Sequence, residues 1–275
     1  MNAAPRRRLS RMLVSLLVTV AVAYLATIGL LYFGQARLIY PAPSAQPAPA
    51  GYAPIDLRTD DGLTLVAGHR PGREGMPTVL FFHGNGMVWP EGAWLMESLA
   101  ARGYGVLLAE YRGYNGNPGR PTEHGLYSDA RAALAWLERQ GVPARDVVLV
   151  GLSVGSGPAV HLARETRPRA VILISPLTSL PAAATAAYPW LPAKWLVHDQ
   201  YDNLAKLAGV EAPILILHGE ADELIPLAHA QALARANPRV RLVTFPGRGH
   251  NMAGDPAVQR SLIEFVGALL DQVAR

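Results

Sequence analysis

The sequence predicts an α/β protein in which a mostly parallel central sheet has helices on both faces and follows one N-terminal transmembrane helix. Three observations support this prediction. Short apolar runs bounded by turn residues recur along the chain, as in strands that are buried on both faces. Apolar repeats at helical spacing separate these runs, which indicates strand–helix alternation. A run of 22 residues without a charge, residues 12–33, lies near the N-terminus.

Composition and charge exclude several classes of protein. Half of the 275 residues are hydrophobic and 17% are charged, which excludes a disordered chain. The first fifty residues hold five arginines and no acid, so they carry +5, and the remaining 20 basic and 21 acidic residues sum to −1. No nucleic-acid partner is therefore expected for residues 51–275. The absence of cysteine excludes a disulfide scaffold, a thiolate metal site and a Cys nucleophile.

Residues 12–34 are predicted to form a retained signal anchor behind a basic N-terminus, residues 1–11. At about 1.5 Å per residue the uncharged run spans roughly 33 Å, enough for a bilayer core. A buried core helix would carry a polar face, and a cleaved signal peptide would have a shorter apolar region with a small-residue exit. Four arginines precede the run and only Arg37 closely follows it. The positive-inside rule then predicts a cytoplasmic N-terminus and an exported domain, which in a Gram-negative bacterium would lie in the periplasm.

Residues 35–50 are expected to link the anchor to the domain. Proline recurs between positions 41 and 50, which favours an extended polyproline II spacer, with a disordered tether as the alternative. The domain, residues 51–275, is long enough for a full core. Its predicted strands are residues 63–67, 78–82, 105–110, 147–152, 170–174, 213–217 and 240–245.

Two helices in the domain have clear sequence boundaries. Thr122 is a candidate N-cap for a helix with an apolar repeat that runs to Leu137, and Gly141 is its predicted stop. Asp255 and Pro256 are expected to begin the last helix. In sheets of this kind, ligands bind at the carboxyl ends of the strands, and the chemical motifs of this sequence follow strands.

Residues 151–155, which read Gly-Leu-Ser-Val-Gly, are the strongest of these motifs. The pattern G-x-S-x-G places a serine on a sharp strand-to-helix turn, exposed above the sheet. The pentapeptide alone is common, but here it follows the strand 147–152 and precedes a helix predicted at 158–164. Ser153 is therefore predicted to be a nucleophile, and a tight turn without catalytic function is the alternative.

A neutral serine needs an imidazole base that is oriented by a carboxylate. His250 lies in a glycine-containing loop between the strand 240–245 and the last helix, so it is the predicted base. Asp222 follows the strand 213–217 and is the predicted carboxylate. The nearby competitors for the carboxylate are Glu220 and Glu223, while His161 and His218 are expected to pack or to support a turn.

Residues 82–86, which read Phe-His-Gly-Asn-Gly, follow an early strand and are predicted to form an oxyanion hole. Its donors would be the backbone N–H groups of Asn85 and of Val154, the residue after the nucleophile. A plain strand-end turn is the alternative.

Together these residues resemble the α/β-hydrolase family, with the order Ser153, Asp222, His250, over essentially residues 51–275. More narrowly, they resemble the membrane-anchored branch of protein depalmitoylase-like hydrolases and their bacterial relatives, on residues 35–41, 111–114, 119–126, 174–180 and 249–251. Asn115 stands where that branch often has glycine, and Arg112 is expected to form a structural ion pair, with a substrate clamp as the alternative. The resemblance implies hydrolysis of esters or thioesters through an acyl-enzyme, without metal or organic cofactor.

Residues 176–210 are predicted to form a short cap, which contains Tyr188, Trp190, Trp195 and Tyr201. Such aromatics could line an acyl pocket, contact the membrane or form the core of the cap. The candidate pocket residues are Tyr114, Tyr188 and Trp190. A cap this short favours small or lipid-like acyl substrates over bulky peptides.

The sequence therefore predicts a membrane-tethered serine hydrolase of the carboxylesterase, lipase or thioesterase type. A peptidase of the same fold and a catalytically silent scaffold of the cell envelope are the alternatives. A dehalogenase is disfavoured because the turn carries serine in place of aspartate.

Overall fold

A computed structural model describes residues 4–271, with side chains from residue 8 to residue 270. The chain divides into two units, Met1–Ile39 and Tyr40–Arg275. The first unit is a single helix, α1 (Ala4–Ile39). Its stretch Arg8–Ile39 is long and apolar enough to cross a membrane, and its most apolar part is not covered by protein. The helix continues through residues 35–39, which the composition assigns to the linker, because no proline lies between Pro5 in its first turn and Pro41.

The extended residues that follow lie on the second unit. The backbone N–H of Gln46 donates to Oδ1 of Asn115 at 2.8 Å, and the side-chain amide of Gln46 donates to Glu91 at 3.1 Å. The compact domain accordingly begins at Tyr40, ahead of the boundary near Gly51 that we expected from composition.

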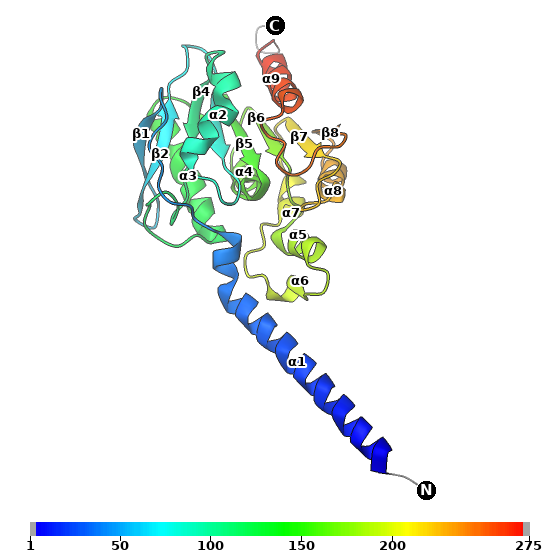
Figure 1. The fold of residues 1–275 in the computed structure, drawn as a ribbon. Helices are drawn as coiled ribbons and strands as arrows, with labels where there is room; N and C mark the ends of the chain where they lie inside the picture. The colour runs from blue at the N-terminus through cyan, green and yellow to red at the C-terminus, as the bar shows by residue number, and fades with distance from the viewer. Residues whose placement is uncertain (1–3, 272–275) are drawn as a thin grey trace. The chain divides into compact units, whose positions relative to one another are not determined.

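Eight strands form one sheet in the order β1-β2-β4-β3-β5-β6-β7-β8, which crosses the domain in Figure 1. β1 pairs with β2 and β2 with β4 in the antiparallel sense, and all other pairs are parallel. The seven predicted strands are all present, four of them with the predicted bounds. The strands are β1 (Ala53–Arg58), β2 (Thr64–Arg70), β3 (Thr78–Phe82), β4 (Gly105–Leu108), β5 (Val147–Leu152), β6 (Ala170–Ile174), β7 (Ile214–Gly219) and β8 (Val240–Phe245).

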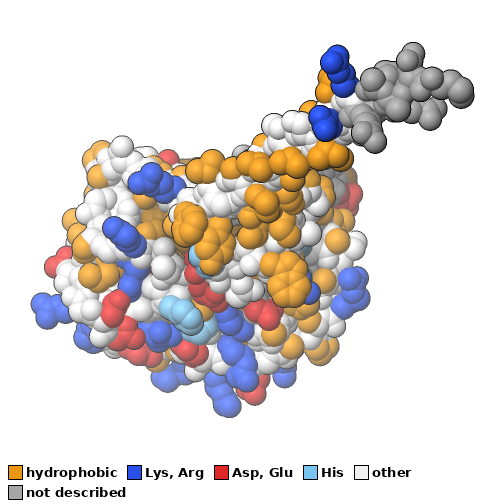
Figure 2. All heavy atoms as spheres, turned by 90° about the horizontal axis from the view of Figure 1, so that it is seen from below, with side chains coloured by type: hydrophobic (Ala, Val, Ile, Leu, Met, Phe, Trp, Pro, Cys, Tyr) orange, Lys and Arg blue, Asp and Glu red, His pale blue; other side chains and the backbone are white. Residues whose placement is uncertain are grey.

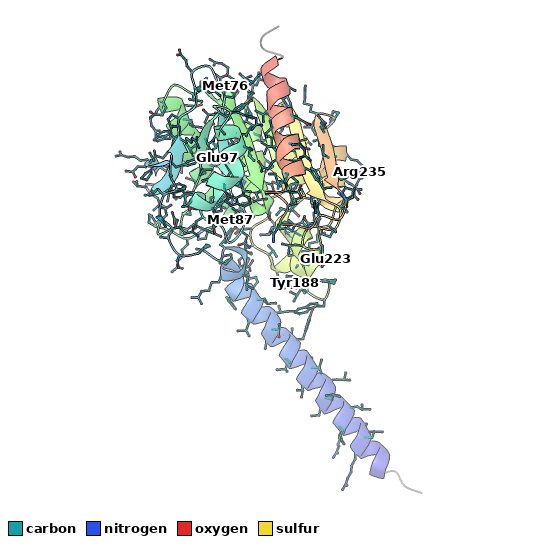
Figure 3. The ribbon with its side chains drawn as sticks, turned by 45° about the horizontal axis from the view of Figure 1, so that its top comes forward. Met76, Met87, Glu97, Tyr188, Glu223 and Arg235 are labelled. Carbon is teal, nitrogen blue, oxygen red and sulfur yellow. The ribbon has the colours of Figure 1, made fainter. Side chains whose placement is uncertain are left out.

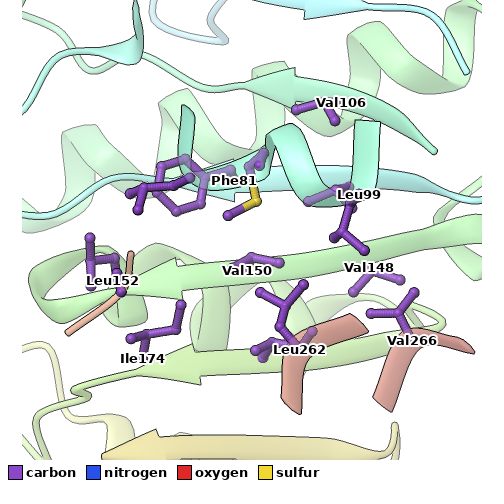
Figure 4. Packing of buried hydrophobic residues seen from close by; sticks show 14 of the residues in the cluster. Phe81, Leu99, Val106, Val148, Val150, Leu152, Ile174, Leu262 and Val266 are labelled. Atoms are coloured by element: carbon purple, nitrogen blue, oxygen red, sulfur yellow. The ribbon is translucent and has the colours of Figure 1, made fainter. Parts of the chain in front are cut away.

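Helices cover both faces of this sheet, as the sequence predicts. On one face α2 (Trp89–Ala100) packs against α9 (Pro256–Asp271). Figure 4 shows how Leu99 of α2 and Leu262 of α9 lie over Val150 at the centre of the sheet. On the other face α3 (Glu123–Arg139) packs against α4 (Ser156–Glu165), and α8 (Ala228–Ala236) packs against β8.

The two helix boundaries predicted from capping residues are confirmed. The Thr122 hydroxyl accepts a hydrogen bond from the N–H of Gly125 at 3.1 Å, and α3 ends just before Gly141, whose φ is 83°. α9 begins at Pro256, where Oδ1 of Asp255 accepts the N–H of Ala257 at 2.8 Å. The positive φ explains why glycine ends the first of these helices.

The cap between β6 and β7 contains three short helices. They are α5 (Leu180–Ala187), α6 (Ala193–Leu196) and α7 (Asn203–Leu207). The interior of the cap is made of small or buried side chains such as Ala183, Ala193 and Tyr201, whereas Tyr188, Trp190 and Trp195 are exposed. Of the predicted cap aromatics, only Tyr201 therefore belongs to a packed interior.

Candidate active site

Ser153 lies at the turn between β5 and α4, in a left-handed backbone conformation with a φ of 53°. The two glycines of the motif are required by close backbone contacts. A Cβ on Gly151 would lie 2.6 Å from the carbonyl oxygen of Gly155, and a Cβ on Gly155 would lie 2.6 Å from that of His83. Only glycine leaves room for such a turn. The helix that follows begins at Ser156, two residues before the predicted start, because the turn is a single 3₁₀ turn over Ser153–Gly155.

The structure brings Ser153, His250 and Asp222 together. Nε2 of His250 lies 3.0 Å from Oγ of Ser153, and Nδ1 of His250 lies 2.8 Å from Oδ2 of Asp222. The three residues follow β5, β8 and β7, so the carboxyl ends of three different strands supply them. Ser175, at the end of β6, donates its hydroxyl proton to the carbonyl oxygen of His250 at 3.2 Å, which holds the histidine loop against the sheet.

Asp222 is held in the ionised form that this arrangement needs. Its Oδ1 accepts the N–H groups of Leu224 at 3.0 Å and Ile225 at 2.8 Å. Burial alone would raise the pKa of Asp222, but the hydrogen bonds from His250 and Ile225 outweigh burial and lower that pKa below its usual value. Because the carboxylate only accepts, Nδ1 of His250 carries the proton and Nε2 is free to accept one from Ser153.

The competing carboxylates lie elsewhere. Glu220 accepts a hydrogen bond from Oγ1 of Thr244 at 2.7 Å, and Glu223 is exposed. Figure 3 labels Met87, Tyr188 and Glu223 at the same end of the domain, whereas Met76 lies at the other end. Met87 follows β3 and Glu223 follows β7, so this is the end at which the parallel strands finish.

His218 lies behind the aspartate and supports its turn. Nε2 of His218 donates to the carbonyl oxygen of Ile225 at 2.8 Å and lies 3.5 Å from Oδ2 of Asp222. The ring is fully buried, and its Nδ1 has no hydrogen-bond partner among the described residues. Burial lowers the pKa of His218, which keeps the ring neutral.

The loop after β3 lies against the serine turn. Phe82, at the end of β3, pairs with Gly151 in β5, and a Cβ on Gly84 would lie 3.5 Å from the carbonyl oxygen of Leu152. The loop that carries Asn85 and the turn that carries Val154 are therefore neighbours at the carboxyl end of the sheet. The two backbone groups predicted to bind an oxyanion thus lie on adjacent loops.

A buried pair beneath this loop was not predicted. Nε2 of His83 lies 2.7 Å from Oε1 of Glu110, and both side chains are fully buried. Glu110 also accepts the N–H groups of Trp89 at 2.9 Å and Tyr111 at 3.0 Å. The available signal was position, because His83 directly follows β3 and Glu110 lies two residues after the neighbouring β4.

Tyr114 does not line an open pocket. Its side chain is only 1% exposed, and its ring centroid lies 5.5 Å from that of His83. The expectation that it contacts substrate is corrected, because the ring packs beneath the loop after β3. Tyr188 and Trp190, the other candidate pocket residues, lie on the surface of the cap.

Arg112 forms the structural ion pair that we expected. Its guanidinium contacts Asp129 at 2.8 Å and Asp61 at 2.6 Å, and the arginine is almost fully buried. Asn115 adopts a φ of 49°, a conformation that glycine favours and asparagine tolerates. Among the residues that the structure describes, no group of three or more His, Cys, Asp or Glu side chains is arranged to hold a metal ion.

Comparisons with known proteins agree with this architecture. Residues 77–205 match the family described as alpha/beta hydrolase fold, and residues 182–268 match that described as TAP-like protein. The uncharacterized protein Rv2307c of Mycobacterium tuberculosis is 41% identical over 250 residues, which cover 86% of this chain and 88% of that protein. Human alpha/beta hydrolase domain-containing protein 17B is 36% identical over 177 residues, which cover 63% of this chain and 60% of that protein.

Solved esterases share the fold. The esterase Pf2001 of Pyrococcus furiosus superposes with a TM-score of 0.70 at 18% identity, over 83% of this chain and 97% of that chain. The esterase RhEst1 of a Rhodococcus species superposes with a TM-score of 0.62 at 16% identity, over 78% of this chain and 99% of that chain.

Proposed function

The chain belongs to the α/β-hydrolase family, and we propose that it is a membrane-tethered serine hydrolase that cleaves carboxylic ester or thioester bonds of small or lipid-like acyl compounds. The observation that carries this proposal is the continuous hydrogen-bonded path from Asp222 through His250 to Ser153, with distances of 2.8 Å and 3.0 Å. A nucleophile, a base and an orienting carboxylate in this geometry are the machinery of acyl transfer.

In the first half of the reaction, Oγ of Ser153 attacks the acyl carbonyl carbon while Nε2 of His250 takes the hydroxyl proton. The carbonyl electron pair moves onto oxygen, where the backbone N–H groups of Asn85 and Val154 donate hydrogen bonds. Each such donor is typically worth about 2.7–4 kcal/mol in the transition state. The tetrahedral intermediate then collapses, the bond to the alcohol or thiol breaks, and the leaving group takes the proton from Nε2.

In the second half, a water molecule releases the acyl group. His250 accepts a proton from the water while the water oxygen attacks the carbonyl carbon of the acyl-enzyme. Collapse of this second intermediate breaks the bond to Oγ, and Ser153 recovers its proton from His250. Throughout, Asp222 holds Nδ1–H and stabilises the imidazolium that forms in each half.

We also propose that α1 anchors the enzyme in a membrane with the N-terminus in the cytoplasm. The arginines before the apolar stretch and the near-neutral domain behind it support this orientation. Alkaline phosphatase fused after Gly51 should be active in a bacterial host. Fusions that stay inactive would contradict export of the domain, without bearing on its chemistry.

The catalytic proposal is tested by turnover of p-nitrophenyl esters by the wild type, Ser153→Ala and His161→Ala. His161 is a matched control, because it is a histidine outside the triad. Its ring stacks on that of Tyr127, with 3.6 Å between the ring centroids. We expect the first substitution to abolish turnover and the second to leave it unchanged. Equal turnover by the wild type and Ser153→Ala would overturn the proposal. Serine-dependent cleavage confined to aminoacyl amides would identify a peptidase instead.

A further inference from the structure

Three exposed aromatic side chains give the cap a distinct surface, here called the aromatic cap surface. Tyr188 is 53%, Trp190 55% and Trp195 81% exposed. Figure 2 views the molecule from below, the side on which Figure 1 draws α5 and α6, and apolar side chains of both α1 and the domain are in view there. Large aromatics gathered at a surface in this way mark an interaction site more often than chance exposure.

The side chains of this surface have the chemistry of a membrane interface. Tryptophan and tyrosine concentrate at the level of lipid headgroups, where the ring is shielded and the polar atom stays hydrated. Nζ of Lys194 lies 5.8 Å from the ring centroid of Trp195. A cation beside an exposed indole suits a lipid surface that carries negative charge.

The attachment of the domain lies close to this surface. Tyr40 directly follows the last residue of α1, and its hydroxyl is 2.6 Å from Oδ2 of Asp199 and 2.8 Å from the hydroxyl of Tyr201. Tyr201 is fully buried, so the point at which the chain enters the domain is fixed to the end of the cap. Trp195 precedes Asp199 by four residues, a chain length of at most about 14 Å.

Chain length limits how far the cap can be from the bilayer. Residues 34–39 continue the helix beyond the uncharged run, and at about 1.5 Å per residue they add at most about 9 Å. The headgroup layer itself extends roughly 6 Å beyond the hydrocarbon core on each side. These lengths allow the cap surface to reach the headgroups.

The cap also leads to the site. Its first residues follow Ser175, which is hydrogen-bonded to the loop of His250, and Thr178 is joined to His229 of α8 at 2.8 Å. Leu224, which is exposed, is hydrogen-bonded through its N–H to Asp222. An acyl chain that leaves the interface beside the cap would thus meet the apolar side chain of Leu224 next to the triad.

We propose that the aromatic cap surface inserts into the headgroup layer of the membrane that α1 crosses and that the site takes its acyl substrate from that layer. The source of the substrate rests on the proposed function, whereas insertion of the cap does not. The chain itself supplies a probe, because its five tryptophans all lie in the domain, at residue 89 or beyond. Brominated lipids, which quench indole fluorescence at close range, therefore report on the domain alone.

The test uses the full chain in vesicles of brominated phosphatidylcholine and phosphatidylglycerol. We expect these lipids to quench the wild type, Trp190→Phe/Trp195→Phe to lose most of the quenching, and Trp94→Phe to keep it. Trp94 is the matched control, because it is also exposed but lies on α2. A wild type that is not quenched would overturn the proposal and favour a protein partner for this surface. Quenching that only Trp94→Phe removes would overturn it by showing that α2, and not the cap, contacts the lipid.

A second measurement separates docking from catalysis. Trp195→Glu should lower turnover of an ester embedded in the vesicles by roughly tenfold, the factor that corresponds to about 1.4 kcal/mol, and leave turnover of a water-soluble p-nitrophenyl ester unchanged. An equal loss on both esters would contradict supply from the membrane. If the wild type cleaves neither ester, the proposed function fails, and the quenching result still decides whether the cap is inserted.

Discussion

Replacing Asp222 with asparagine should stop catalysis by trapping His250 in the wrong tautomer. Oδ1 of Asp222 accepts two backbone N–H groups, from Leu224 and Ile225, while Oδ2 faces Nδ1 of His250. An asparagine must turn its oxygen toward the two N–H groups, since the opposite orientation leaves both donors without a partner, and the buried N–H of Ile225 alone then costs about 1–3 kcal/mol. Its NH₂ group then faces His250.

This orientation decides the protonation of the imidazole. A donor at Nδ1 requires a lone pair there, so the ring proton moves to Nε2, which can no longer accept the proton of Ser153. The expected loss in kcat is about 10⁴-fold, or about 5.5 kcal/mol in the activation free energy. The side chain is isosteric and keeps both backbone hydrogen bonds, so the melting temperature should change little.

The assay is steady-state turnover of a p-nitrophenyl ester, together with ¹⁵N chemical shifts of the His250 ring. Glu220→Gln is the control, because that carboxylate contacts Thr244 and not the histidine. An Asp222→Asn enzyme that keeps more than about a tenth of wild-type kcat would refute the reasoning, because the stated barrier allows far less. A ring proton found on Nδ1 in the variant would refute it as well.

Three further predictions concern stability. Gly155→Ala should lower the unfolding free energy by about 2–3 kcal/mol, because its Cβ would collide with the backbone carbonyl oxygens of Phe82 and His83 at the end of β3. Thermal denaturation measures this loss. Arg112→Met should cost about 3–5 kcal/mol by leaving the buried Asp129 unpaired, measured by urea unfolding. Burial lowers the pKa of His218 in the folded state, so the unfolded state binds more protons as the pH falls. The stability that depends on neutral His218 is therefore complete above about pH 6.5 and decreases below that value. Melting temperatures measured across this pH range test the prediction.

Each of these predictions has a matched control. Gly267→Ala, in α9 where nothing lies within 4 Å of an added Cβ, should be neutral or stabilising. Arg167→Met removes an exposed ion pair with Glu211 and should change stability little. His218→Asn should flatten the decline toward acid pH. Equal losses of stability in the two glycine variants would contradict the steric reason, and equal losses in the two arginine variants would contradict the buried ion pair. A pH dependence of stability that His218→Asn leaves unchanged would contradict the role given to His218.

The parallel strands were predictable because a short continuous apolar run is typical of a strand that is buried on both faces of a sheet. β3, β5 and β6, which are buried along their whole length, have the predicted bounds for this reason. β8 also has its predicted bounds, although it is an edge strand and only partly buried. β1 was missed because it is an edge strand whose residues are mostly exposed, with only Leu57 fully buried, and it therefore lacks an apolar run.

At the site, residues with a distinctive motif could be placed, and residues with a supporting role could not. Ser153 and His250 were found from the turn and loop in which they lie. The pairing of His83 with Glu110 joins residues 27 positions apart, and a sequence alone does not pair them. Tyr114 was misassigned because a tyrosine near a site has an apolar ring that packs as readily as it binds.

Docking of the extended linker had no local signal either. Its contacts reach Glu91 and Asn115, residues that are distant in sequence, and its proline content indicated only an extended chain. The hydrogen bonds of Tyr40 to Asp199 and Tyr201 could not be predicted for the same reason, because these partners in the cap are distant in sequence.

The proposed function depends above all on Ser153 being the nucleophile of an acyl-transfer reaction. The most direct measurement is reaction of the full chain with a fluorophosphonate, followed by peptide mapping of the phosphonylated residue in the wild type and in Ser153→Ala. We expect a single adduct on Ser153 that the substitution abolishes, with no change in folding. An adduct on another residue, or none on a folded wild-type chain that hydrolyses esters, would contradict it.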